Sequence, residues 1–351
     1  MLQLDGSMGE GGGSVLRTSL SLSALTGRPF TIENIRANRS KPGLRPQHLT
    51  AVRAAAAVCQ AELSGDQPGA TRLRFHPTTI PQAGDYHFDV TESSPSGMSA
   101  GSVTLIIQTL LWPLAFTGAP SKITARGGTF VPFSPPYHYL SEVVQPLYKL
   151  MGLELENKLV QWGWMSAGGG CVETNVDPAK GLQAMNLEPR AVERVRCIAA
   201  VTNLPSHIPQ RMSSRAGKLI RQRGLSADIK AVRETGDGPG AGIILWIPQA
   251  GFSSLGRPGL PAEKVADAVI ADFTAFMENG AAVDQYLADQ LLVPMALANG
   301  VSSFTTNRIT GHTLTTIELL QLWLGISITV EGTTGNRGRI EVHGIGYRPT
   351  E

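Results

Sequence analysis

The sequence is poor in cysteine and has no long hydrophobic run. Its three cysteines, Cys59, Cys171 and Cys197, are odd in number and far apart, which argues against a disulfide framework and against a Cys-x-x-Cys zinc site. No stretch reaches the roughly 18 apolar residues of a membrane span, and the N-terminus lacks the basic and apolar parts of a secretion signal. We therefore expect a soluble, cytoplasmic protein without a membrane partner.

Charge is also scarce, and it is nearly balanced. Lys and Arg number 30 against 28 Asp and Glu, and charged residues make up only 17% of the chain. This excludes a polybasic coat for nucleic acid, so any nucleic-acid contact must be local. Gly (39) and Pro (23) are abundant, which is typical of many tight turns, and the 42% hydrophobic residues in 351 positions suffice for a large core.

An internal repeat predicts the fold. A helix-like apolar run ends in a marker glycine and is followed by a strand-like segment at Gly27, at Gly118 and, more faintly, at Gly300. A second helix is expected after each, over 49–59, 140–151 and 316–324. The pattern predicts an α/β fold of three related units, which is a domain duplication rather than a solenoid.

The segment between the second and third units has its own α/β pattern. Strands are expected at 195–201 and 243–247, and helices at 213–223 and 262–277. We therefore expect a large domain formed by 1–181 and 280–351, with a smaller α/β domain inserted at 182–279. The first inserted helix carries a basic stripe that either contacts RNA phosphates or is simply solvated: Arg211, Arg215, Lys218 and Arg221.

Counting from the marker glycines places polar residues at equivalent positions. Arg17, Gln108 and Gln290 each lie 10 residues before a marker. Arg39 and His312 each lie 12 residues after one. If the units pack around a pseudo-threefold axis, these groups converge on one centre, and otherwise each is satisfied within its own unit. A buried amide without a partner is costly, so a shared polar centre would explain the pattern.

The segment around His312 suggests nucleophilic chemistry. Thr315 and Glu318 have the spacing of a capping box, which predicts a helix start there and places His312 in the preceding loop. The positive end of the helix dipole favours phosphate and disfavours a protonated imidazole. An uncharged imidazole is the form that a nucleophile needs. A merely solvated loop histidine is the plain alternative.

Other segments could bind a phosphate or a purine. The glycines of 9–14 let backbone N–H groups approach an anion, although the spacing fits neither a Walker motif nor a complete dinucleotide motif. The loop 36–48 brings four cations together ahead of a helix. Tyr286, Asp289 and Gln290 share one helix face and would suit a purine ring, or they form a solvated stripe.

Together these segments resemble the RNA 3′-terminal phosphate cyclase family over essentially the whole chain. The matching segments, in chain order, are 9–13, 16–17, 35–39, 41–44, 47–49, 168–170, 238–240, 286–290 and 311–312. The resemblance implies an ATP-dependent enzyme that converts an RNA 3′-phosphate end to a 2′,3′-cyclic phosphodiester. His312 matches the histidine that attacks the α-phosphate of ATP and carries AMP, which then passes to the RNA 3′-phosphate and is displaced by the 2′-hydroxyl.

The resemblance also implies roles for further residues. Glu10 matches a carboxylate linked to a divalent cation, Mg or Mn. The positions around the phosphates are Arg17, Arg36, Arg39 and Gln47. The adenylate-pocket positions are Gln108, Pro135, Tyr139, Tyr286, Asp289 and Gln290. The family fold has three units similar to the C-terminal domain of a translation initiation factor, plus an inserted domain, with a homodimer as a possible assembly. The segment 129–134 departs from the more polar stretch of bacterial relatives.

Two other classes compete with this interpretation. The first is the family's non-catalytic branch, a ribosome-assembly binding factor that lacks the nucleophile present here as His312. The second is an enolpyruvyl transferase, which has related repeat units but leaves the adenylate-pocket match unexplained.

Overall fold

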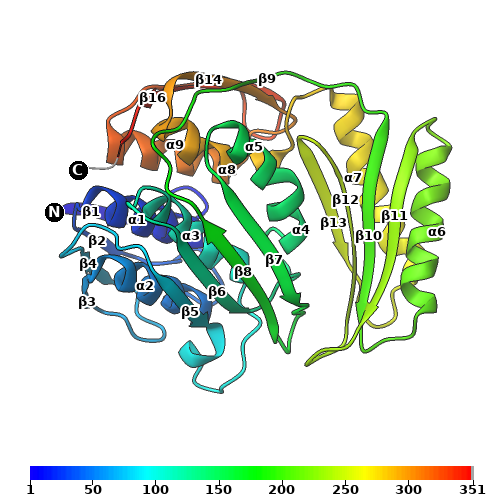
Figure 1. Ribbon diagram of the computed structural model, residues 1–351, viewed down its shortest axis with the longest axis horizontal. Coiled ribbons are helices and arrows are strands. Elements are labelled where there is room, and N and C mark those ends of the chain that lie inside the picture. The colour runs from blue at the N-terminus through cyan, green and yellow to red at the C-terminus, as the bar shows by residue number, and fades with distance from the viewer. Residues whose placement is uncertain (349–351) are drawn as a thin grey trace.

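The computed structural model describes residues 1–348 and shows a mixed α/β protein (Figure 1). Within these residues the strands form four sheets of four strands each. The expected α/β class is thereby confirmed. No helix in the described part of the chain is long and apolar enough to cross a membrane.

The first sheet is built from the N-terminal unit. Its elements are β1 (Leu2–Asp5), α1 (Gly13–Thr26), β2 (Phe30–Glu33), α2 (Pro46–Cys59), β3 (Glu62–Ser64) and β4 (Leu73–His76). The strand order is β1-β2-β4-β3, in which β1 and β2 are parallel and the other pairs are antiparallel. Helix α1 ends at Gly27, whose φ of 69° is a left-handed conformation that glycine adopts without strain.

Two further sheets repeat this order of pairing. The unit around the second sheet contains β5 (Asp85–Asp89), η1 (Val90–Ser93), α3 (Val103–Ala115), β6 (Ser121–Gly127), α4 (Tyr137–Tyr139), η2 (Leu140–Val144), α5 (Gln145–Leu150), β7 (Leu155–Gln161) and β8 (Gly170–Val176). The unit around the third sheet contains β9 (Asn186–Leu187), α8 (Gln285–Leu297), β14 (Asn299–Thr306), α9 (Gly311–Leu324), β15 (Ile328–Gly332) and β16 (Gly338–Ile345). Their orders are β5-β6-β8-β7 and β9-β14-β16-β15, and each begins with a parallel pair, as in the first sheet.

The fourth sheet belongs to the inserted segment, on the right in Figure 1. The inserted segment contains β10 (Arg194–Thr202), α6 (His207–Arg221), β11 (Ser226–Glu234), β12 (Gly240–Ile247), β13 (Ala250–Leu255) and α7 (Ala262–Asn279). The strand order in its sheet is β11-β10-β12-β13. Its helices cover a separate core that includes Val195, Leu245 and Phe273. Strand β9, inside the expected range 182–279, pairs instead with β14, so the inserted sheet begins only at Arg194.

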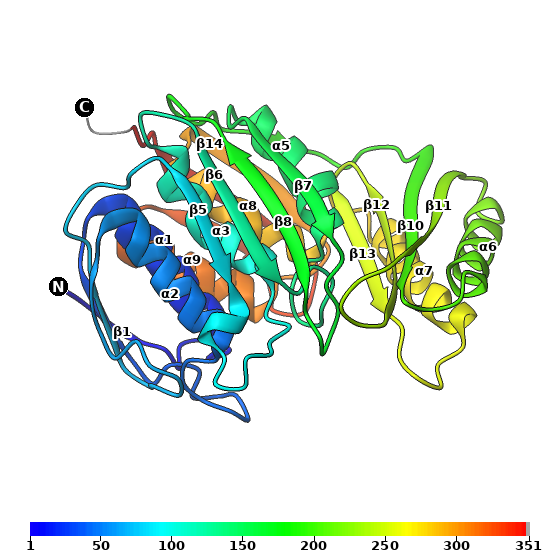
Figure 2. The ribbon, with the colours of Figure 1, turned by 60° about the horizontal axis from the view of Figure 1, so that its bottom comes forward.

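Helix α1 is the central packing element of the large domain. It contacts α2, α3 and α9, and α9 in turn contacts α8. Figure 2 shows these helices gathered between the sheets. Leu16 and Leu20 on α1 are fully enclosed, because apolar residues at helical spacing bury one face against each neighbour. The N-terminal ends of several of these helices meet, and the candidate site lies there.

A column of stacked rings joins the second unit to the inserted domain. Phe130 stacks on Trp164 at 5.2 Å, Trp164 on Trp162 at 5.3 Å, and Trp162 on His138 at 5.0 Å between ring centroids. Trp164 Nε1 donates a hydrogen bond of 2.8 Å to the Thr202 hydroxyl at the end of β10. The segment 129–134 supplies Phe130 and therefore contributes to the joint between the two domains.

Candidate active site

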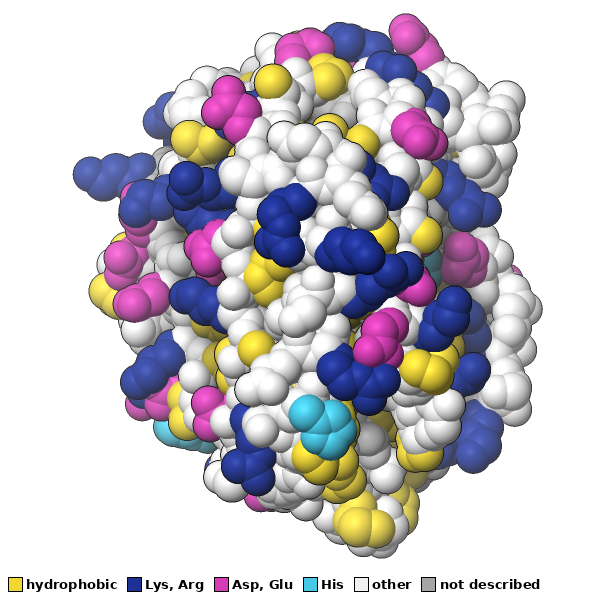
Figure 3. All heavy atoms as spheres, turned by 90° about the vertical axis from the view of Figure 1, so that its right-hand side faces the viewer, with side chains coloured by type: hydrophobic (Ala, Val, Ile, Leu, Met, Phe, Trp, Pro, Cys, Tyr) yellow, Lys and Arg dark blue, Asp and Glu magenta, His cyan; other side chains and the backbone are white. Residues whose placement is uncertain are grey.

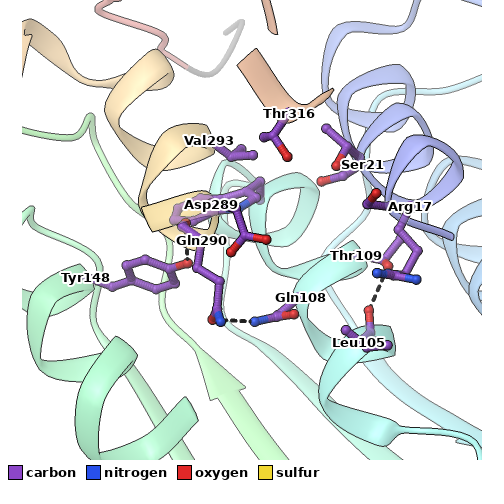
Figure 4. Close-up of a pocket in the computed structure, with 13 residues that line it drawn as sticks. Arg17, Ser21, Leu105, Gln108, Thr109, Tyr148, Asp289, Gln290, Val293 and Thr316 are labelled. Atoms are coloured by element: carbon purple, nitrogen blue, oxygen red, sulfur yellow. Dashed lines mark hydrogen bonds between the residues drawn. The ribbon is translucent and has the colours of Figure 1, made fainter. Parts of the chain in front are cut away.

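A cavity of about 110 Å³ lies between α1, α3, α8 and α9 (Figure 4). Arg17, Gln108 and Gln290 all line it, which confirms that these three repeat-equivalent side chains converge. Gln108 Nε2 donates to Gln290 Oε1 at 2.7 Å, so each amide has a partner from another unit. His312 is not part of the cavity wall, although Ser14 and Thr316 beside it are.

Asp289 and Arg17 bring a carboxyl group and a guanidinium group to this cavity. Burial, and then the neighbouring Asp284, raise the pKa of Asp289 to about 7, although the positive charge of Arg17 acts in the opposite direction. Burial also lowers the pKa of Arg17 to about 10. Because removal from water penalises both charged forms, the cavity is suited to a ligand that offers new polar partners.

The helix that carries His312 begins earlier than the sequence predicted. Helix α9 starts at Gly311, and its N-cap is Thr310, whose hydroxyl accepts from Thr313 N at 3.1 Å. Thr315 instead donates to the Gly311 carbonyl within the helix, so the predicted capping box with Glu318 is wrong. His312 therefore lies in the first turn of α9 and not in a loop, and it remains next to the positive end of the helix.

Both ring nitrogens of His312 contact residues from the glycine-rich segment. Nε2 lies 3.1 Å from Glu10 Oε2, and Nδ1 lies 3.4 Å from Ser14 Oγ. The side chain of His312 is 40% exposed. Burial lowers its pKa, and Arg17 and Arg39 add to the lowering against the opposing effect of Glu10. The imidazole is therefore favoured in its uncharged form at neutral pH.

The glycines beside Glu10 are required by close approach from other elements. A Cβ on Gly12 would lie 2.8 Å from Arg39 Nη2, and a Cβ on Gly13 would lie 2.5 Å from His48 Nε2. Gly9 and Gly11 also have positive φ values, 54° and 56°. Side chains would therefore displace the neighbours, and the segment stays free for backbone N–H groups to face a ligand.

Positive charge gathers around the N-termini of α1 and α2. Burial lowers the pKa of Arg36, and the neighbouring Arg45 and Arg39 lower it further. His48 is 4% exposed, and burial followed by the charges of Arg17, Arg36 and Arg45 holds its pKa well below the usual value. Arginines that depress one another's pKa create a field that attracts anions.

Three of the predicted phosphate residues have specific local contacts. Arg39 Nη2 lies 3.5 Å from Glu10 Oε2. Arg36 Nη1 donates to the Lys41 carbonyl at 2.6 Å and to the Gly43 carbonyl at 3.0 Å, so it also holds its own loop. Gln47 Oε1 accepts from Ser102 N at 3.0 Å and thereby fixes the start of α3.

Tyr139 lies outside the cavity wall, in contrast to Asp289 and Gln290. It is 3% exposed, and its hydroxyl donates to Asp284 at 2.8 Å. Asp284 is the N-cap of α8 and also accepts from Tyr286 N, from Leu287 N and from Gly251 N of the inserted sheet. Burial raises the pKa of Asp284 to about 6. In this structure the Tyr139 hydroxyl is therefore bonded to the N-cap of α8, and Tyr139 does not line the cavity.

Tyr286 and Pro135, the remaining residues predicted for an adenylate pocket, lie near the N-terminal ends of α8 and α3. Tyr286 precedes Gln290 by one turn of α8 and is 57% exposed. The Pro135 carbonyl accepts from the Thr104 hydroxyl at 2.7 Å, which ties its loop to α3 one turn before Gln108. Both residues are thus placed by contacts close to the cavity, although neither lines it.

A cation site made only of protein side chains is not present in the part of the chain that the structure describes. Residues 1–348 contain no group of three or more His, Cys, Asp or Glu side chains that could hold a metal ion. Glu10 supplies a single carboxylate, with His312 and Arg39 as its neighbours. Magnesium often binds through one or two carboxylates together with waters and ligand phosphates. Glu10 could supply the carboxylate of such a site, in which waters and phosphates provide the other ligands.

The sequence analysis gave Ser14, Arg45 and His48 no roles of their own. All three lie inside segments that it singled out, 9–14 and 36–48, and only the long-range packing of α1, α2 and α9 brings them to the centre. Two of the four cations in the basic stripe on α6 are paired with carboxylates: Arg211 with Glu263 at 2.7 Å, and Arg215 with Asp267 at 2.6 Å. Figure 3 faces this side and shows acidic side chains among the basic ones.

Comparisons with known proteins agree on one family. The model of the family described as "RNA 3'-terminal phosphate cyclase" matches residues 8–330. The RNA 3′-terminal phosphate cyclase of Trichormus variabilis is 48% identical over 326 residues, covering 92% of this chain and 93% of that protein. The one of Pyrobaculum aerophilum is 38% identical over 353 residues, covering 99% of each. Similarity to the enolpyruvyl transferase NikO from Streptomyces tendae is slight, with a TM-score of 0.38 and 10% identity over 99% of this chain and 50% of that one.

Proposed function

The chain belongs to the RNA 3′-terminal phosphate cyclase family, and on this basis we propose that it uses ATP to convert an RNA 3′-phosphate into a 2′,3′-cyclic phosphodiester. In the proposed reaction His312 attacks the α-phosphorus of ATP and pyrophosphate leaves. The AMP then moves from His312 to the RNA 3′-phosphate. The adjacent 2′-hydroxyl finally attacks the activated phosphorus and releases AMP.

The observation that carries the proposal is the state of His312. Its imidazole is partly exposed, has a lowered pKa and stands at the positive end of α9. An uncharged ring keeps a lone pair for attack, and the helix end favours the phosphate being attacked. A histidine kept only for packing would be enclosed. The same feature argues against the non-catalytic branch of the family, which lacks this nucleophile.

The phosphates would bind where α1 and α2 begin. Neither helix has a side-chain cap. In α1 this leaves the N–H groups of the first turn for oxygen atoms, whereas in α2 Pro46 has no N–H and His48 N already donates to the Arg45 carbonyl at 2.8 Å, so Gln47 N is the N–H of that turn that can serve an anion. Arg17, Arg36 and Arg39 surround this place, and a guanidinium can bind phosphate oxygens in a bidentate manner. A divalent cation, Mg²⁺ or Mn²⁺, held by Glu10 and the phosphates would offset the charge of the triphosphate.

The adenine would occupy the cavity between α3 and α8. Gln108 and Gln290 offer amide donors and acceptors there, and Asp289 offers a carboxyl group. Tyr286 on α8 and Pro135, in the loop that is tied to α3 through Thr104, would cover the faces of the ring. A nucleotide bound in this way would extend its α-phosphate toward the helix N-termini and His312.

Labelled ATP tests the proposal directly. Incubation with α-labelled ATP and Mg²⁺ should attach acid-labile, base-stable label to the protein, whereas γ-labelled ATP should attach none. Addition of an RNA with a 3′-phosphate should remove the label and yield a cyclic end, and an RNA with a 3′-hydroxyl should do neither. Folded protein that takes up no label and leaves the RNA 3′-phosphate unchanged would instead support a non-catalytic binding factor.

A further inference from the structure

One short segment contacts both nitrogens of the His312 ring. Glu10 precedes α1 and faces Nε2 at 3.1 Å, and Ser14, in the first turn of α1, faces Nδ1 at 3.4 Å. Within residues 1–348 these are the only side chains with a hydrogen-bonding contact to the ring. Between them the backbone passes close to Arg39 at Gly12 and to His48 at Gly13, where a side chain would displace these neighbours.

The two contacts differ in chemistry. An ionised carboxylate only accepts hydrogen bonds, so Glu10 favours the tautomer with the proton on Nε2. A hydroxyl both donates and accepts, so Ser14 can serve either tautomer of the ring. An uncharged imidazole carries one proton, and the partner of the other nitrogen decides which atom keeps its lone pair. Ser14 can therefore keep its hydrogen bond to Nδ1 in both tautomers of the ring.

We propose that Ser14 is a positioning residue for His312, a role that rests on the proposed function. In the resting protein the Ser14 hydroxyl donates to Nδ1 while Nε2–H faces Glu10. Exchange with solvent at the partly exposed ring moves the proton to Nδ1, and the Ser14 oxygen then accepts from Nδ1–H. This leaves the lone pair on Nε2, the atom that faces the carboxylate and the phosphate-binding end of α1.

The bonds and protons balance in this scheme. Nε2 forms a bond to the α-phosphorus, and the bond from that phosphorus to the oxygen bridging to the β-phosphate breaks. The electron pair of the broken bond leaves with pyrophosphate. The ring keeps its single proton on Nδ1, bonded to Ser14 Oγ, and therefore carries the positive charge until AMP is transferred onward.

The kinetic test compares two substitutions of the same residue. Ser14→Ala removes the hydroxyl, and we expect labelling of His312 by α-labelled ATP to slow by about tenfold, as for the loss of one hydrogen bond to a reacting group. Ser14→Thr keeps the hydroxyl and should restore the rate to within about threefold. The KM for ATP should stay nearly constant in both. An unchanged labelling rate in Ser14→Ala, or a rate in Ser14→Thr as low as in Ser14→Ala, would overturn the assignment.

A second measurement needs neither ATP nor catalysis. In ¹⁵N spectra of resting protein with labelled imidazoles, the His312 signals are identified by their loss in His312→Ala. Ser14→Ala should shift the Nδ1 signal, whereas Ser14→Thr should leave it in place. An unshifted Nδ1 signal in Ser14→Ala refutes the contact itself. If Ser14→Ala shifts the Nδ1 signal but the wild-type protein never binds AMP covalently, the proposed function is refuted and the contact between Ser14 and His312 stands.

Discussion

The first and third units meet at the candidate site, and they differ in whether a side chain caps the N-termini of their helices. In the first unit α1 and α2 begin after Gly12 and Arg45 without a side-chain cap. In the third unit Asp284 caps α8 and Thr310 caps α9. Free N–H groups can bind an anion, whereas a capped end fixes the direction of the side chains that follow. The difference suggests that the first unit binds charge and the third holds the reacting groups.

Removing the reacting group of the third unit should have the largest effect. His312→Ala is expected to abolish protein labelling by α-labelled ATP, a loss of at least about 10³-fold, because no other side chain replaces the nucleophile. The free energy of unfolding should change by less than about 1 kcal/mol, since the residue is partly exposed. His343→Ala, which alters an exposed histidine of the same unit, is the control and should be labelled normally.

Removing a cap should damage the fold more than the chemistry. Asp284→Ala deletes the acceptor of three backbone N–H groups and of the Tyr139 hydroxyl, and we expect a loss of about 3 kcal/mol in the free energy of unfolding by urea. Tyr139→Phe removes one of these bonds and should cost about 1 kcal/mol. An equally stable Asp284→Ala would mean that the cap does not hold α8.

The charge-binding role of the first unit can be tested at Arg39. Arg39→Ala should lower the rate of RNA cyclisation by about 10- to 100-fold, and Arg39→Lys should restore little because a lysine lacks the bidentate fork. Arg53→Ala, on the same unit but paired with Asp66, is the matched control. Full activity in Arg39→Lys would show that the site needs only a point charge.

Asp289 predicts a pH dependence of stability. Its folded pKa of about 7 lies above the value of about 3.9 in an unfolded chain, so its contribution is complete below the lower value and is lost as the pH rises through the higher one. With Asp289→Asn, the decline in the free energy of unfolding as the pH rises should be smaller by about 1–2 kcal/mol. This is less than the pKa difference alone would give, because the carboxyl group lines an open cavity. Urea unfolding at several values between pH 4 and 8 measures it, and parallel curves for both proteins would contradict the prediction.

The smallest effect on stability is expected where the units share an amide pair. Gln108→Leu breaks the bond to Gln290 but adds apolar contact, so the free energy of unfolding should change by less than about 1 kcal/mol. Labelling by α-labelled ATP should nevertheless fall several-fold, because the amide that we propose faces the adenine is lost. Unchanged labelling would indicate that this pair serves only the packing of α3 and α8.

Part of this arrangement was readable from the sequence. Because a repeated unit places equivalent residues on equivalent faces, counting from the glycines found Arg17, Gln108 and Gln290 before any packing was known. The predicted start of α9 was wrong because Thr310 and Thr315 are both threonines that can cap a helix. Only the backbone geometry shows that Thr310 is the N-cap and that Thr315 lies inside the helix. Local spacing could identify the helix but not its first residue.

Contacts between distant units were beyond the sequence. Tyr139 was predicted to bind the nucleotide, but its hydrogen bond to Asp284, 145 positions away, could not be predicted, because the two residues meet only where η2, which follows α4, packs beside α8. His48 was seen only as part of a motif, since its burial depends on α1 passing over it at Gly13. Such roles are set by packing between units, which no periodicity within one unit encodes.

The aromatic column has an optical consequence. Of the five tryptophans, Trp162, Trp164 and Trp246 lie at the joint between the large and inserted domains, Trp112 lines the cavity, and Trp323 packs on Phe30. Indole emission shifts when a stacked ring becomes hydrated. The protein thus carries built-in fluorophores at the joint, in the cavity and in the core, and replacing tryptophans by phenylalanine in turn would assign each signal. Separation of the inserted domain could then be followed in real time without an attached dye.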